Sequence, residues 1–294
     1  MNDCLVLDTF PLPHLNMSAI LSTPAPTLDF VLPGLLTGTV GAVIAPGATG
    51  KSMSALQLAV ALATGTDACG LGVAPSPCSV LVLAAEDPVP ILHQRLQDVC
   101  IGMDSELIKD NLIVCPLLGQ QHDFAAETDM TANRISKIFD IRGRGSVRLV
   151  VIDTLSRFHS GDENDRRDAC RVMRILEQLA VYGNAAVVFL HHVSKAAALN
   201  GQSSIAQAAK GSAVWTDEAR WVAFLSGMSV DEAAAMGKDE MERKGYVRFG
   251  LNKTNYCAQR PDIWLKRGDG GVLSVADLSI KTNGKKVVRN ENWN

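Results

Sequence analysis

The sequence predicts an α/β fold in which helices flank a mostly parallel central sheet, with an antiparallel extension toward the C-terminus. Continuous apolar runs alternate with helical stretches as far as about residue 211, which is typical of parallel strands buried on both faces. Closely spaced apolar runs follow, as expected for antiparallel strands. With 294 residues, of which 47% are hydrophobic, the chain can bury one large core.

Apolar runs of four to eight residues predict the individual strands. Those of the parallel part are GAVIA (41–45), VLVLAA (80–85), LIVC (112–115), LVVI (149–152) and AAVVFL (185–190). Helices are predicted between them at 52–64, 88–101, 128–142 and 166–182. The antiparallel extension is predicted from WVAFLSG (221–227), YVRFGLN (246–252), DIWLKR (262–267) and GVLSVADL (271–278), interrupted by a helix at 230–237.

The chain divides into three parts. Residues 1–30 contain four prolines and little periodicity, and we expect them to form an N-terminal arm that packs on a neighbouring subunit. Residues 31–278 carry the alternating pattern and form the core. The polar, basic stretch 279–294 is predicted to be a flexible tail.

Charge and cysteine content narrow the possible environments. The net charge of −3 and pI near 6.1 give no overall basic character, so nucleic-acid binding would require a local patch or an assembled ring. The seven cysteines include no C-x-x-C pair, which favours reduced thiols and a cytoplasmic location. An acidic N-terminus and the lack of a long apolar segment predict neither a signal peptide nor a membrane partner.

The most informative motif lies between the first strand and the first helix of the core. It reads Ala45, Pro46, Gly47, Ala48, Thr49, Gly50, Lys51 and Ser52, followed by Met53. This is a P-loop, whose backbone N–H groups wrap phosphates at a helix N-terminus. Lys51 would reach the β- and γ-phosphates and Ser52 would bind Mg²⁺, so ATP and Mg²⁺ are the predicted ligands. A glycine-rich turn that matches by chance is the alternative, and the strand, loop and helix together disfavour it.

Two acidic residues at strand ends complete a predicted hydrolytic site. Asp153 ends an apolar strand, where a carboxylate can hold Mg²⁺. Thr154 follows it instead of an acid, so the base that activates water must come from another strand. Glu86, after VLVLAA, is the predicted base. The alternative is that Glu86 or Asp87 caps the next helix, and Asp87 is the better candidate for that cap.

Two adjacent histidines, His191 and His192, end the apolar run AAVVFL. Side chains alternate between the faces of a strand, so the pair cannot easily share one metal ion. We expect one imidazole to contact the γ-phosphate and report its presence, while the other packs into the sheet. Strand geometry alone does not assign the two roles.

The order of these motifs resembles that of the RecA-like P-loop NTPases. The stretches APGATGKSMSALQLA, AAEDP, VIDTLSRFH, VFLHHVSK and VRFGLNKTNY are similar to those of the RepA replicative helicases of IncQ-type broad-host-range plasmids, over about residues 28–275. The resemblance implies a homohexameric ring that hydrolyses ATP at its subunit interfaces and moves 5′ to 3′ on single-stranded DNA during plasmid replication. It also implies replication-initiator and primase partners.

The resemblance assigns further residues. His192 falls on the γ-phosphate sensor position, and Lys195 and Lys210 flank the segment that faces the channel of the ring and binds DNA. Arg220 matches the arginine finger. Lys253 matches a second catalytic cation, although Asn255 stands where an arginine is expected. A solvated loop and ordinary surface charges are the alternatives for these four basic residues.

The sequence therefore predicts an ATP-driven replicative DNA helicase. One alternative is a RecA-fold regulatory or recombination ATPase that binds DNA or protein without unwinding. A nucleotide-binding signalling module is the other. DNA-stimulated hydrolysis is expected of the first two classes, and strand displacement only of the helicase.

Overall fold

The structure is a computed structural model, and it describes residues 6–7, 12–67, 69–126, 130–161, 165–193 and 213–278. The predicted tail at 279–294 lies outside these ranges, as does the segment that contains Lys195 and Lys210. The core around the predicted nucleotide site lies largely within them.

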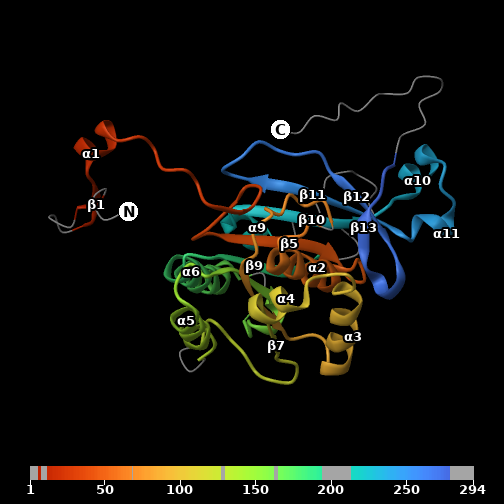
Figure 1. The fold of residues 1–294 in the computed structure, drawn as a ribbon, viewed down its shortest axis with the longest axis horizontal. Coiled ribbons are helices and arrows are strands. Elements are labelled where there is room, and N and C mark those ends of the chain that lie inside the picture. Colours follow the sequence, from red (N-terminus) through yellow and green to blue (C-terminus); the bar gives the residue numbers. More distant parts are fainter. Residues whose placement is uncertain are drawn as a thin grey trace.

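A nine-stranded sheet runs through the centre of the molecule in the order β13-β12-β11-β10-β5-β9-β8-β6-β7 (Figure 1). The parallel strands are β5 (Val40–Pro46), β6 (Ser79–Ala84), β7 (Leu112–Pro116), β8 (Val147–Asp153), β9 (Ala186–Val193) and β10 (Trp221–Gly227). The antiparallel strands are β11 (Tyr246–Thr254), β12 (Ile263–Arg267) and β13 (Leu273–Val275). This arrangement confirms the predicted fold class.

Strand β10 differs from the prediction in its pairing. The sequence pattern places WVAFLSG in the antiparallel extension, but β10 pairs in parallel with β5, with Trp221 opposite Gly41. It pairs antiparallel only with β11 on its other side. The extension therefore begins one strand later, because the chain crosses over from β9 and returns beside β5 before it reverses direction.

Helices cover both faces of the sheet. One face carries α2 (Lys51–Thr64), α3 (Val89–Val99) and α4 (Ser105–Asn111), and the other carries α5 (Thr131–Arg142), α6 (Arg166–Gly183) and α9 (Ala213–Glu218). Alternate residues of one strand serve the two layers: Ala42 and Ile44 of β5 join the cluster under α5 and α6, whereas Val43 and Ala45 join the cluster under α2. This double burial explains why the strands read as continuous apolar runs.

Short elements complete the C-terminal part. They are α10 (Val230–Met236), α11 (Glu240–Arg243) and the 3-10 turns η1 (Leu155–Arg157) and η3 (Asp269–Gly271). Ser229 and Asp239 each form a capping box, in which the side chain accepts from the third helical N–H while a glutamate returns the bond.

The N-terminal residues contain more secondary structure than the sequence suggests. They include β1 (Val6–Leu7), β2 (His14–Leu15) and α1 (Met17–Ser22), which extend away from the body of the molecule (Figure 1). No residue of α1 is buried. The hairpin of β3 (Phe30–Leu32) and β4 (Leu35–Leu36) then leads into the core. The packing of the arm on a neighbouring subunit stays a prediction.

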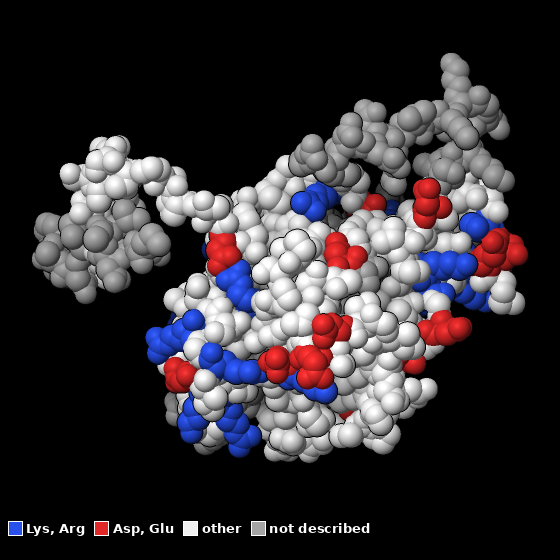
Figure 2. Space-filling model, in the orientation of Figure 1, with Lys and Arg blue, Asp and Glu red and all other residues white. Residues whose placement is uncertain are grey.

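Charges of both signs are interspersed on the face of the molecule shown in Figure 2. This distribution agrees with the near-neutral composition. Within the described ranges, none of the helices is both apolar and long enough to cross a bilayer.

Candidate functional site

The P-loop connects the carboxyl end of β5 to the start of α2. Gly50 is the N-cap of α2, and it provides no side chain to satisfy the first N–H groups of the helix. No acidic residue occupies the first turn, so the positive end of the helix dipole is uncompensated there. These two properties make the N-terminus of this 14-residue helix a site for an anion such as a phosphate group.

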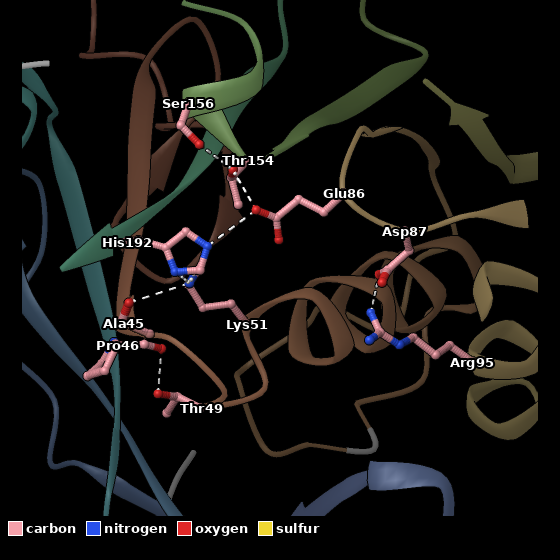
Figure 3. Close-up of polar contacts among 10 residues, drawn as sticks. All are labelled: Ala45, Pro46, Thr49, Lys51, Glu86, Asp87, Arg95, Thr154, Ser156 and His192. Atoms are coloured by element: carbon pink, nitrogen blue, oxygen red, sulfur yellow. Dashed lines mark hydrogen bonds and ion pairs between the residues drawn. The ribbon is translucent and has the colours of Figure 1, made fainter. Parts of the chain in front are cut away.

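The conformation of the loop is fixed locally. Ala48 and Gly50 have positive φ angles of 63° and 97°, which turn the chain tightly. The Thr49 hydroxyl donates to the Pro46 carbonyl oxygen at 2.7 Å and closes the turn (Figure 3). Ala45 is buried in the core below the loop, and Met53 packs against Val60 and Val99. The core therefore holds both ends of the loop in place.

Lys51 lies inside this turn, and only 5% of its surface is exposed. Its ammonium group donates to Nδ1 of His192 at 2.7 Å and to the Ala45 carbonyl oxygen at 3.4 Å. Burial lowers the pKa of Lys51 to about 8, although the nearby carboxylates of Glu86 and Asp153 oppose the change. The side chain thus remains largely cationic near neutral pH and is poised for an anionic ligand.

His192 joins Lys51 to Glu86 (Figure 3). Because an ammonium group can only donate, Nδ1 of His192 accepts from Lys51, and Nε2 therefore carries the proton that it donates to Oε1 of Glu86 at 3.3 Å. The Thr154 hydroxyl also donates to Oε1, at 3.1 Å, and lies 2.9 Å from the Ser156 hydroxyl. Three strand ends, those of β6, β8 and β9, supply this network.

The two histidines point in opposite directions, as strand alternation requires. The His191 side chain is buried, 5% exposed, and its ring centre lies 6.3 Å from that of Trp215 in α9. Burial lowers the pKa of His191 to about 4, and the charges of His192 and Lys51 act in the same direction. His191 is thus a neutral core residue, and His192 faces the P-loop.

The predicted Mg²⁺ ligands lie together. The Asp153 carboxyl group accepts a hydrogen bond from Ser52, and its Oδ1 atom is buried without a hydrogen-bond partner. Burial raises the pKa of Asp153 to about 6, the Ser52 hydrogen bond lowers it, and the charges of Glu86 and Asp87 raise it further. A buried carboxylate oxygen with no partner beside a P-loop hydroxyl fits the first ligands of a hard divalent cation, with waters and phosphate oxygens as the rest.

Asp87 does not have the capping role that the sequence suggests. The N-cap of α3 is Pro88, and no side chain caps this helix. Asp87 instead forms an ion pair with Arg95 of α3, with both side chains partly buried (Figure 3). The proline that follows Asp87 moves the helix start beyond it, so its carboxylate reaches along the helix to the arginine.

Arg220 and Lys253 lie far from the P-loop of their own subunit. The Arg220 backbone N–H donates to the Val40 carbonyl oxygen at 2.9 Å, at the beginning of β5, whereas the P-loop follows the other end of that strand. Seven residues of β-strand separate the two ends by about 20 Å. Lys253 donates to the carbonyl oxygens of Asp217 and Thr216, at 2.8 and 3.3 Å, and so closes the C-terminus of α9.

Two residues of the site are not identified by the sequence patterns. Thr154 orients Glu86, and its position directly after Asp153 is an available signal. Arg267, at the end of β12, donates to the carbonyl oxygens of Ala48 and Thr49 on the P-loop. No local pattern connects positions so far apart in the chain.

The family of the AAA domain matches residues 7–198. The chain belongs to this family. The match contains Lys51, Glu86, Asp153 and His192, and it ends before Arg220. This AAA domain is a RecA-like P-loop ATPase domain, and the solved structures that resemble it have the same fold.

Two such structures cover most of the chain. The crystal structure of the RadB recombinase superposes with a TM-score of 0.51 and 14% sequence identity, over 84% of this chain and 93% of that chain. A second solved structure, also of an ATPase domain, superposes with a TM-score of 0.56 and 14% identity, over 89% of this chain and 96% of that chain. At this level of identity the similarity establishes the fold.

Proposed function

We propose that this chain is an ATP-dependent replicative DNA helicase, a homohexameric ring that moves 5′ to 3′ on single-stranded DNA and unwinds duplex during plasmid replication. The contact chain from Lys51 through His192 to Glu86 carries the proposal. It connects the residue that would hold the γ-phosphate to the carboxylate that would activate water. The motifs shared with the IncQ-type plasmid helicases supply the biological setting.

The P-loop would bind ATP through its backbone N–H groups, and Lys51 would turn from His192 to the γ-phosphate. Ser52 and Asp153 would hold Mg²⁺, which, when bound, neutralises charge on the β- and γ-phosphate oxygens. Phosphate binding stabilises the Lys51 cation further, because it adds a negative charge to a buried site.

Glu86 would take a proton from water as the water oxygen bonds to the γ-phosphorus and the bond to ADP breaks. Thr154 fixes the carboxylate by donating to Oε1. Loss of the Lys51 contact would free His192 to turn toward the γ-phosphate. Its position in β9, next to the segment that contains Lys195 and Lys210, supports a role in relaying the nucleotide state to bound DNA.

The position of Arg220 supports catalysis between subunits. An arginine about 20 Å from its own P-loop, along β5, can act only on the site of another subunit. Its side chain is exposed at that edge of the sheet. A ring that brings this edge against the P-loop edge of the next subunit would complete every site with one arginine finger.

The test compares ATP hydrolysis with and without single-stranded DNA, and strand displacement on a 5′-tailed duplex. Lys51→Ala, which removes the phosphate-binding cation, is the control without turnover. Hydrolysis stimulated by DNA and coupled to displacement supports the helicase. Stimulated hydrolysis without displacement would favour a RecA-fold regulatory or recombination ATPase, and no response to DNA would favour a signalling module.

A further inference from the structure

Arg267 is brought to the P-loop by the topology of the antiparallel extension. Strand β12 is antiparallel to β11, which is antiparallel to β10, so β12 runs in the same direction as β5. Its last residue, Arg267, therefore lies at the same edge of the sheet as the P-loop. The guanidinium group donates through Nη2 to the carbonyl oxygens of Thr49 and of Ala48, the latter at 3.3 Å.

The charge of Arg267 is not neutralised by a carboxylate among the described residues, none of which forms an ion pair with it. The side chain is half-buried, and burial lowers the pKa of Arg267. A partly desolvated guanidinium group that contacts only backbone carbonyl oxygens retains its affinity for an anion. The nearest predicted anion is the polyphosphate in the P-loop.

Peptide geometry connects these bonds to phosphate binding. The peptide bonds 48–49 and 49–50 are trans, so the C=O and N–H of each unit point in opposite directions. With the carbonyl oxygens of Ala48 and Thr49 turned to the guanidinium group, the N–H groups of Thr49 and Gly50 face away from it. A cation on a carbonyl oxygen also polarises the peptide and strengthens its N–H as a donor.

Gly50 allows this close approach. A Cβ atom at Gly50 would lie 3.0 Å from Nη1 of Arg267, closer than a side chain packs without displacing its neighbour. The φ angle of 97° also disfavours any residue other than glycine. The glycine that P-loops require for turning thus also makes room for the arginine here.

We propose that Arg267 is a positioning residue for nucleoside polyphosphates, which fixes the Ala48–Gly50 peptides as phosphate donors from the outer side of the P-loop. It acts within its own subunit, in contrast to the role proposed for Arg220 on a neighbour. The inference rests on the proposed ATP site. It predicts an effect on ground-state binding of both ATP and ADP, because the loop N–H groups contact phosphates present in each.

The test measures the affinity of fluorescent ATP and ADP analogues for Arg267→Gln, which removes the charge and the fork of donors. We expect the Kd for both nucleotides to rise about tenfold, the scale of losing charge-assisted hydrogen bonds, with kcat at saturating ATP within about twofold of wild type. Arg267→Lys keeps the charge but loses the fork, and its Kd should rise about threefold.

Lys266→Gln is the matched control, because Lys266 is exposed on the other face of β12 and should leave both Kd values unchanged. Unchanged nucleotide affinity in a folded Arg267→Gln protein would overturn the inference. If that variant does not fold, Arg267→Lys decides, and a wild-type Kd would overturn it. Failure of the wild-type protein to bind ATP would instead refute the proposed function, so the two results are distinguishable.

Discussion

The buried imidazole of His191 makes acid stability a quantitative test of the site. The pKa of His191 is lowered from 6.5 to about 4 in the folded protein, mainly by burial. Between these two values the unfolded chain binds a proton that the folded chain does not, so stability falls as the pH falls. The contribution is fully present above pH 6.5 and is lost as the pH approaches 4.

The size of the effect follows from the two pKa values. Their difference corresponds to about 3 kcal/mol when titration is complete. Between about pH 8 and pH 5 the free energy of unfolding should fall by about 2 kcal/mol through this group alone. For a protein of this size, that loss lowers the melting temperature by about 5 °C.

The assay is thermal unfolding from about pH 8 to pH 5 for the wild type and His191→Leu, which replaces the imidazole by a side chain that cannot titrate. We expect the variant to lose about 2 kcal/mol less than the wild type on acidification. His192→Leu is the matched control, because it removes the exposed neighbour and leaves His191 buried. Equal acid sensitivity of the wild type and His191→Leu would refute the reasoning.

Three further predictions concern turnover. Glu86→Gln should bind ATP normally and hydrolyse it at least about 10²-fold more slowly in a steady-state assay, the scale of losing a general base, and near-normal turnover would remove Glu86 from that role. Arg220→Ala should assemble and bind ATP but lose about 10³-fold in kcat, as expected without an arginine finger. A wild-type kcat for Arg220→Ala would exclude that assignment. His192→Asn should retain basal hydrolysis while single-stranded DNA no longer stimulates it, and an unchanged stimulation ratio would contradict a sensor role.

The strands and long helices of the core are predictable because their burial is recorded locally. Strand β8 is buried along nearly its whole length and reads as LVVI, and α6 carries apolar residues at helical spacing. Helix α4 is not predictable in this way, because SELIKDN is a short, polar segment with no buried residue. The parallel pairing of β10 also escapes prediction, because a strand sequence does not specify which neighbour it joins.

The same distinction applies to the candidate site. The P-loop is one contiguous motif, so its location between a strand and a helix is predictable. Strand alternation separates the two histidines, but only the fold brings His192 to Lys51 at 2.7 Å. Arg267 reaches Ala48 across a sequence separation of 219 residues, through the direction of three strands. A contact of that kind depends on topology, which single-residue patterns do not encode.

Strand displacement tests the central claim most directly. The substrate is a fluorescent duplex with a 5′ single-stranded tail, incubated with the wild-type protein, ATP and Mg²⁺, with Glu86→Gln and a 3′-tailed duplex as controls. We predict displacement of the 5′-tailed duplex by the wild type alone. DNA-stimulated hydrolysis by the wild type without displacement of either duplex would contradict the helicase assignment.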